Sequence, residues 1–334
     1  MYGRKFKAAA ALLLIAVSAW AQGPNNTGNY YQNADGKKGR NLKTALFHII
    51  SANVHPLEYG GLYDAYKKTD VREDGKIWDM YSGITNYVPG ADENHGGGGH
   101  EGVNYNREHS FPKSWFGGKI KPMYTDLFHI YPTDSWVNSK RWHLPFGEVD
   151  TKKKYEGSKN MFSKWGPSKI NIKGYSGDVF EPNDEYKGDF ARTYFYMATR
   201  YEDKIAKWGN NVQGGAPMLN HDSYNAYTPW AIEMLMRWAK EDPVSQKEID
   251  RNNAVDKEQN NRNPFIDYPG LEQYIWGNMI EVPFSYDAFK DPTGIENVEI
   301  KAEDSDVMYD INGCRVDNDY KGIVIKNGKK VLVN

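Results

Sequence analysis

The sequence predicts a mixed α+β fold, and three observations support this prediction. Helical apolar spacing dominates the second half of the 334-residue chain. A pattern of strand, loop, strand and helix occupies residues 103–141. Short alternating apolar runs, separated by turn residues, follow Pro292. We therefore expect a mainly helical domain in which a β–β–α unit is embedded, followed by a small β appendage at the C-terminus.

Hydrophobic spacing and capping residues predict where the helices lie. Thr133 or Asp134 is expected to cap the third helix, and Thr228 followed by Pro229 is a typical helix start. The helix over 187–201 places its apolar residues on one face. Together, the helices are expected at residues 41–53, 60–68, 134–141, 187–201, 229–240 and 244–259.

The predicted strands and turns complete the domain organisation. Strands are expected at 103–109 and 128–131, after a glycine-rich surface loop at 90–102. Asn312-Gly313 and Asn327-Gly328 stand between alternating apolar runs and predict two hairpins. We expect a main domain over residues 22–290, and a linker with the small β appendage over residues 291–334.

The first 21 residues have the pattern of a signal peptide. Three basic residues precede an apolar run over residues 8–17, and Ala19-Trp20-Ala21 has the small-x-small form of a cleavage site. The run is shorter than the roughly 20 apolar residues that span a bilayer. We expect a protein that is secreted, or exported to a periplasm, and that has no membrane span.

Composition and charge exclude two classes of protein. Cys314 is the only cysteine, so the chain is not a disulfide-stapled scaffold, and its 10 Trp, 24 Tyr and 13 Phe must supply much of the core. Loss of Arg4, Lys5 and Lys7 with the leader lowers the formal charge from −2 to −5, which excludes a uniformly basic nucleic-acid-binding surface. Residues 107–154 nevertheless hold nine Lys or Arg against five Asp or Glu, which forms either a positive groove or an ordinary solvated surface.

The β–β–α segment contains three side chains that could form a reactive site. Glu108 and Asn138 offer a carboxylate and an amide oxygen, which suit a hard cation such as Mg²⁺. His109, near the ordinary histidine pKa of about 6.5, could accept a proton at neutral pH. Neighbouring residues on a strand point to opposite sides, so Glu108 and His109 can share a site only at an irregular strand end. A Glu-His pair alone is common and is more often structural than reactive.

Longer strings around these residues resemble the bacterial endonuclease I family. YNREHSFPKSW begins at Tyr105, DLFHIYP begins at Asp126, and VNSKR begins at Val137. The resemblance extends over residues 30–280, with further similar stretches at 38–50, 78–81, 187–197 and 261–267. Members of this family are secreted or periplasmic nucleases of the His-Me finger, or ββα-metal, superfamily. Several motifs in the same order are far more specific than one motif.

The resemblance implies a function and a role for each site residue. Glu108 and Asn138 would hold one divalent cation, Mg²⁺ with Ca²⁺ or Mn²⁺ as alternatives, and His109 would be the general base. The activity would be hydrolysis of DNA or RNA with little sequence preference, leaving 5′-phosphates. Asp126 and His129 would position the finger.

The identity of the basic residue that binds the scissile phosphate stays open. Some family members place an arginine in a long loop after the histidine, but residues 117–125 are short here and hold only two lysines. For Arg192 a structural ion pair is an equal alternative. The candidates for phosphate or substrate binding are Arg107, Lys119, Lys121, Arg141 and Arg192.

Two further segments and three other functions also stay open. Glu93, His95, His100 and Glu101 could bind a second metal, or could belong to an exposed glycine-rich loop. The C-terminal appendage resembles sorting domains of the type IX secretion system, which implies an outer-membrane secretion machinery as partner; a stabilising hairpin pair is the alternative. The richness in Tyr and Trp also suits a secreted carbohydrate-binding protein, or a glycosidase, which would need two facing acids. An inactive nucleic-acid binder is a third alternative.

Overall fold

The computed structural model describes residues 23–94, 99–210 and 212–292, together with four short strands between residues 308 and 333. The chain divides into two units, Met1–Thr293 and Gly294–Asn334, and each is described here by itself. The predicted signal peptide lies outside the described residues. No helix in the described part of the chain is long and apolar enough to cross a membrane.

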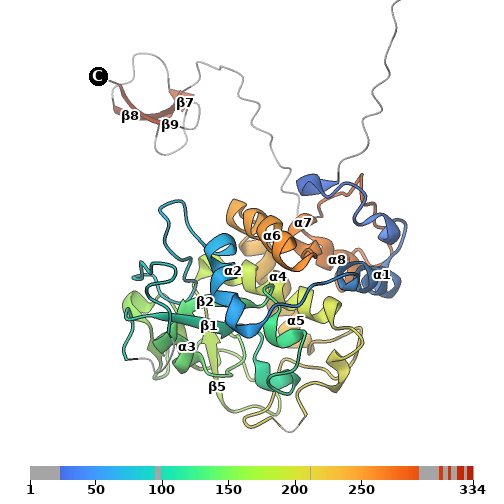
Figure 1. Cartoon of the computed structure of the whole chain (residues 1–334), viewed down its shortest axis with the longest axis horizontal. Helices are drawn as coiled ribbons and strands as arrows, with labels where there is room; N and C mark the ends of the chain where they lie inside the picture. Colours follow the sequence, from blue (N-terminus) through green and yellow to red (C-terminus); the bar gives the residue numbers. More distant parts are fainter. Residues whose placement is uncertain are drawn as a thin grey trace, which may run out of the picture. The chain divides into compact units, whose positions relative to one another are not determined.

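Helices are the main regular secondary structure of the first unit (Figure 1). The α-helices are α1 (Gly39–Ser51), α2 (Leu62–Thr69), α3 (Ser135–Arg141), α4 (Lys187–Arg200), α5 (Pro229–Glu241), α6 (Gln246–Gln259), α7 (Pro264–Asp267) and α8 (Leu271–Ile275). Short 3-10 helices are Pro24–Asn26, Gln32–Ala34, Tyr59–Gly61, Lys113–Phe116, Met123–Thr125, Lys159–Met161, Asp184–Tyr186 and Ile205–Lys207. All six helices expected from the sequence are present, with ends that differ by at most two residues from those predicted.

Local capping explains where several helices begin. Asp134 accepts hydrogen bonds from the backbone N–H groups of Trp136 and Val137 and so caps α3. Pro229 occupies the first turn of α5, where its missing N–H costs nothing. Ser245 and Glu248 form a capping box, which starts α6 two residues later than expected.

Helix α4 lies at the centre of the unit and differs from its prediction. Its spacing predicts one apolar face, yet all 14 of its residues are buried. Helices α1, α5 and α7 pack around it, so its polar side must also be covered. Arg192, on that polar side, is neutralised by Glu248 of α6 through hydrogen bonds of 2.6 and 2.8 Å.

Strands β1 (Tyr105–His109) and β2 (Ile130–Asp134) form an antiparallel pair that runs directly into α3 (Figure 1). Glu108 faces Tyr131 in this register, and His109 faces Ile130. The second strand begins two residues later than the sequence predicts. The reason is a turn at Asp126, which accepts hydrogen bonds from the N–H of Phe128 through its side chain and from the N–H of His129 through its carbonyl.

A second sheet was not anticipated from the sequence. It consists of β3 (Glu156–Gly157), β4 (Lys164–Pro167) and β5 (Asp178–Glu181) in that spatial order, all antiparallel. These strands have two to four residues and contain Gly and Pro, so they lack the alternating pattern that marks longer strands. Trp165 of β4 stacks on Phe180 of β5 with the two rings parallel.

The C-terminal unit contains a four-stranded antiparallel sheet. Its strands are β6 (Met308–Asp310), β7 (Arg315–Val316), β8 (Gly322–Lys326) and β9 (Lys329–Val333), in the order β7-β6-β8-β9. Lys326 pairs with Lys329 at the end of the β8–β9 ladder. Both predicted Asn-Gly turns, at 312–313 and 327–328, lie outside the described residues.

Candidate active site

A cavity of about 670 Å³ opens beside the end of β1. It lies between β1, the chain that follows β1, helix α3 with the two residues after it, and the turn before α2. The lining residues are Tyr59, Asn94, Asn106, Arg107, Glu108, His109, Pro112, Lys113, Ser114, Asn138, Ser139, Trp142 and His143. We call this space the β1–α3 cavity. It brings together all three residues that the sequence singled out for chemistry.

Glu108 is a buried carboxylate at the wall of this cavity. The Tyr81 hydroxyl donates to Glu108 Oε1 at 3.0 Å, and Arg141 Nε lies 3.5 Å from the same oxygen. Burial raises the pKa of Glu108, although Arg141 and Tyr81 favour the ionised form. Both partners contact Oε1, so the other carboxylate oxygen is the one disposed toward a ligand in the cavity.

His109 is held in one tautomer when it is neutral. Its Nε2 lies 3.2 Å from the carbonyl oxygen of Tyr124, which can only accept, so Nε2 carries the hydrogen. The lone pair is then on Nδ1. Burial lowers the pKa of His109 well below the usual histidine range, and the nearby His129 and Lys113 lower it further. The ring is therefore neutral and able to accept a proton at neutral pH.

The end of β1 explains how adjacent residues reach the same cavity. The strand stops at His109, and the next residue, Ser110, bonds to the carbonyl of His129 through both its N–H and its hydroxyl. Glu108 and His109 both line the cavity, as the sequence required of an irregular strand end.

Asn138 reaches the cavity from α3. Its amide nitrogen donates to Asn106 Oδ1 at 2.6 Å, so its own oxygen is directed away from Asn106. Asn106 precedes Glu108 by two residues on β1, which places both on one face of the strand. With Asn94, which also lines the cavity, the site therefore offers one carboxylate and three amide side chains. Oxygen donors of this kind fit a hard divalent cation that keeps several waters, such as Mg²⁺.

The stretch that contains the whole cavity lining, residues 38–270, matches the endonuclease I family. The chain belongs to the endonuclease I family. An extracellular ribonuclease of Bacillus subtilis (strain 168) is 35% identical over 270 residues, which cover 79% of this chain and 83% of that protein. An extracellular ribonuclease of Bacillus amyloliquefaciens is 37% identical over 258 residues, which cover 75% of this chain and 79% of that protein. The resemblance noted in the sequence is confirmed.

In this endonuclease I family member, only one of the five basic residues expected to bind phosphate or substrate lines the cavity. Arg107 donates to the carbonyl of Tyr59 at 2.9 Å, and its guanidinium lies over the rings of Tyr59 and Tyr63 at 3.9 and 4.3 Å. These contacts fix the guanidinium at the cavity wall. Lys113, which the sequence analysis did not single out, is an exposed second cation of the lining.

The other four cations lie elsewhere. Lys119 is exposed, and Lys121 pairs with Glu58 at 2.5 Å; neither lines the cavity. Arg141 is fully buried behind Glu108 and donates to the carbonyl of Ser110 at 2.5 Å. Arg192 is buried in α4, in its ion pair with Glu248. Arg141 and Arg192 are therefore buried, and their guanidinium groups bond to partners inside the fold and not to the cavity.

Asp126 and His129 hold the connection between the two strands. Asp126 Oδ2 accepts hydrogen bonds from the hydroxyls of Tyr196 and Tyr201 at 2.9 and 2.7 Å. His129 donates through Nε2 to the carbonyl of Met123 at 2.6 Å, and its ring lies 5.5 Å from that of His109. Neither residue lines the cavity, and both contact the segment that carries Tyr124.

Several lining residues gave little signal in the sequence. Asn106 and Lys113 fall inside the string that resembles the family, and the i, i+2 spacing of Asn106 and Glu108 could have revealed Asn106. Tyr59 and Trp142 lie in segments without any such string, and only the tertiary fold brings them to the cavity.

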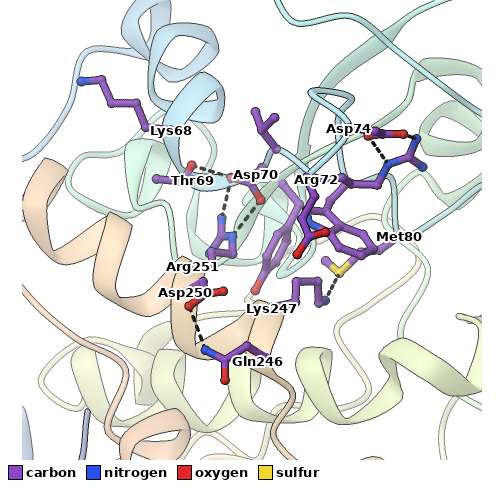
Figure 2. A pocket seen from close by; sticks show the side chains of 14 residues that line it. Lys68, Thr69, Asp70, Arg72, Asp74, Met80, Gln246, Lys247, Asp250 and Arg251 are labelled. Atoms are coloured by element: carbon purple, nitrogen blue, oxygen red, sulfur yellow. Dashed lines mark hydrogen bonds and ion pairs between the residues drawn. The ribbon is translucent and has the colours of Figure 1, made fainter. Parts of the chain in front are cut away.

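A second cavity, of about 630 Å³, lies between the end of α2 and the start of α6 (Figure 2). Its central charges are already paired: Arg251 Nε lies 2.7 Å from Asp70 Oδ1, and Lys247 bonds to Asp189. None of the site residues expected from the sequence lines it. We therefore locate the candidate active site in the β1–α3 cavity.

The glycine-rich loop is only partly described. His95 lies outside the described residues, and His100 Nδ1 lies 3.0 Å from the carbonyl of Glu101. The Glu101 carboxylate accepts hydrogen bonds from the hydroxyl of Ser82 and the N–H of Lys159. Among the described residues, no group of three or more His, Cys, Asp and Glu side chains could hold a metal ion. The second metal stays a prediction.

Proposed function

We propose that this protein is a secreted, metal-dependent endonuclease that hydrolyses the phosphodiester bonds of RNA and DNA. In this proposal β1, β2 and α3 are the ββα-metal finger of the family. Glu108 and Asn138 hold one divalent cation, Mg²⁺ in the first instance, and His109 is the general base.

The observation that carries the proposal is the orientation of His109. Its Nε2 bonds to the carbonyl of Tyr124, so the basic Nδ1 is available in a cavity that also presents Glu108 and Asn138. Histidine is the commonest general base, and it must be neutral at the working pH to accept a proton from water. The lowered pKa of His109 fits this requirement.

Each residue of the site then has a defined task. Oxygens of Glu108 and Asn138 would hold the cation. When bound, the cation would act as a Lewis acid that stabilises negative charge on the scissile phosphate and on the 3′-oxygen leaving group. His109 Nδ1 takes a proton from the attacking water as the water oxygen bonds to phosphorus. The bond from phosphorus to the 3′-oxygen breaks, the 3′-oxyanion takes a proton from solvent water, and the products carry a 5′-phosphate and a 3′-hydroxyl. Arg107 and Lys113 attract the anionic chain.

The comparisons support the substrate class and the destination of the protein. Both relatives are extracellular ribonucleases by name, which supports RNA as a substrate and secretion through the N-terminal leader. Cleavage of DNA, and engagement of an outer-membrane secretion machinery by the C-terminal unit, belong to the proposal on the strength of the sequence resemblance alone.

A glycosidase is the less supported alternative. Among the described residues that line the β1–α3 cavity, Glu108 is the sole acid, whereas a glycosidase needs two facing carboxyl groups.

The test is an assay of the purified protein on plasmid DNA and on RNA, each in Mg²⁺ and in EDTA. We expect cleavage in Mg²⁺ and none in EDTA. Product 5′ ends should accept a label from polynucleotide kinase only after phosphatase treatment, because they carry phosphate. Cleavage of RNA that survives EDTA and leaves 2′,3′-cyclic or 3′-phosphates would contradict the proposal, since it would mean attack by the substrate's own 2′-hydroxyl.

A further inference from the structure

Trp142 is exposed at the edge of the β1–α3 cavity. With 58% of its surface accessible, it is the most exposed of the large apolar side chains that the structure describes. It directly follows the last residue of α3, the helix that carries Asn138, and it lines the cavity. A tryptophan in this position loses the apolar burial that large aromatic rings normally gain.

The backbone of Trp142 is also unusual. It has φ 50° and ψ −112°, a region that glycine enters freely and that L-residues rarely adopt. The conformation is held by two hydrogen bonds: the Trp142 N–H donates to the carbonyl of Asn138 at 2.9 Å, and the Trp142 carbonyl accepts from Arg141 Nη1 at 3.3 Å. Neither burial nor backbone preference explains a tryptophan here, so a role toward a ligand is the remaining physical reason.

Two other rings of the cavity, those of Tyr59 and His109, already stack on neighbouring side chains. Tyr59 stacks on Tyr124 at 4.4 Å, and the guanidinium of Arg107 lies 3.9 Å from its centroid, so both faces of Tyr59 are covered. His109 stacks on Tyr124 as well. The Trp142 ring touches only the neighbouring His143 among aromatic side chains of the described residues.

We propose that Trp142 is the base-stacking residue of this active site, and that the enzyme therefore prefers nucleic acid whose bases are unpaired where it cuts. This inference rests on the proposed nuclease function and adds a substrate class to it. A nucleobase beside the scissile phosphate packs on the exposed indole, while Arg107 and Lys113 contact the phosphates. Stacking on an aromatic ring is tolerant of sequence because every base has a π-face.

Duplex substrates cannot use this contact in the same way. Bases inside a double helix are stacked on both neighbours, so a base must be unstacked before the indole can reach its face. Single-stranded RNA and single-stranded DNA share the required chemistry, and the indole does not distinguish between them. The preference predicted is therefore for single strands over duplexes, in both kinds of nucleic acid.

The sharpest variant is Trp142→Gly, because glycine suits the observed φ and removes the ring. We expect the folded protein to be at least as stable as the wild type. We expect its KM for single-stranded RNA and DNA oligonucleotides to rise about 5- to 150-fold, the loss of one stacked base. Trp142→Phe keeps a ring and should recover most of the affinity.

A matched control and an abasic substrate isolate the stacking contact. Met161 is 54% exposed and has φ 54°, but it lies outside the cavity, so Met161→Gly should leave KM unchanged. An oligonucleotide made wholly of abasic residues should be cut equally by the wild type and by Trp142→Gly, because neither can stack a base. The preference of the wild type for single strands over a matched duplex should shrink in Trp142→Gly.

The outcomes separate this inference from the function on which it rests. If the wild-type protein cleaves no nucleic acid, the proposed function fails. If the wild type cleaves but Trp142→Gly keeps the wild-type KM and strand preference, Trp142 stacks no base and this inference is overturned. Thermal unfolding of each variant shows whether a change in KM comes from a folded protein.

Discussion

Nε2 of His109 lies 3.2 Å from the carbonyl oxygen of Tyr124, and this one contact assigns the two ring nitrogens different roles. The carbonyl belongs to the connection between β1 and β2, where Asp126 and His129 anchor the chain. The two residues expected to position the finger therefore also hold the acceptor that orients the imidazole, although neither touches the cavity.

His109→Ala should lower kcat by about 10²–10⁴, the usual contribution of a positioned base, with little change in KM. The imidazole acts in the transition state and contributes little to holding substrate. The measurement is steady-state cleavage of a labelled oligonucleotide. His48→Ala, an exposed histidine on α1, is the control and should behave as wild type. A His109→Ala protein with wild-type turnover would mean that another group activates the water.

Asn138→Ala should raise the Mg²⁺ concentration needed for half-maximal activity by at least about 10–100-fold, because loss of even an outer-shell partner of a metal ligand has an effect of this size. The helix should persist, because alanine is the best helix former. Lys140→Ala, exposed on the same helix, is the control. Titration of activity with Mg²⁺ measures the effect, and an unchanged midpoint would remove Asn138 from the cation site.

Arg141→Met should reduce the free energy of unfolding by about 3–5 kcal/mol, because it leaves the buried Glu108 without its ion partner. It also removes the donor to the carbonyl of Ser110. Urea unfolding gives the value, and exposed Lys140→Met should cost little. If Arg141 instead gripped the substrate phosphate, KM would rise while stability stayed the same.

Stability should fall as the pH drops below about 6.5, in part because of His129. Burial lowers its pKa in the folded protein, whereas the unfolded chain has the ordinary value of about 6.5. Below that value His129 is protonated in the unfolded state but not in the folded state. The free energy of unfolding therefore falls by up to about 1.4 kcal/mol for each pH unit. His129→Gln cannot titrate and should have a shallower slope between pH 6.5 and 5. An equal slope in both proteins would assign the acid sensitivity to other groups.

Removal of residues 299–334 should leave nuclease activity unchanged. The unit Met1–Thr293 contains every lining residue of the β1–α3 cavity, and the C-terminal unit has a sheet of its own. The comparison is kcat/KM of the full and shortened chains. A shortened protein that is folded but inactive would show that the C-terminal unit is needed for catalysis.

The β–β–α segment could be predicted because its signals are local. Asp134 is a helix cap by residue type, and Glu108, His109 and Asn138 stand in strings that resemble the family. The start of β2 was predicted two residues too early, because the turn at Asp126 is made by hydrogen bonds from Phe128 and His129 that apolar patterning does not reveal.

The roles of the cations depended on burial, which a single sequence does not reveal. Arg192 lies on the polar side of α4, and the sequence pattern predicts that this side faces solvent. In the structure, neighbouring helices pack over this side and bury Arg192. Arg107 and Arg141 are equally basic in the sequence, but one lies at the cavity wall and the other behind it. Trp142 was missed because nothing in its neighbourhood distinguishes an exposed tryptophan from a core one.

The enclosure of α4 has a kinetic consequence for a chain that no disulfide crosslinks. A helix with no side facing water cannot exchange its amide hydrogens through local fraying of a solvated face. Its amides should therefore exchange only when the surrounding helices separate, and their exchange reports the free energy of that opening. The same opening would expose the chain of the proposed secreted enzyme to proteolysis. Hydrogen exchange at α4 thus measures the opening on which resistance of this unit to proteolysis depends.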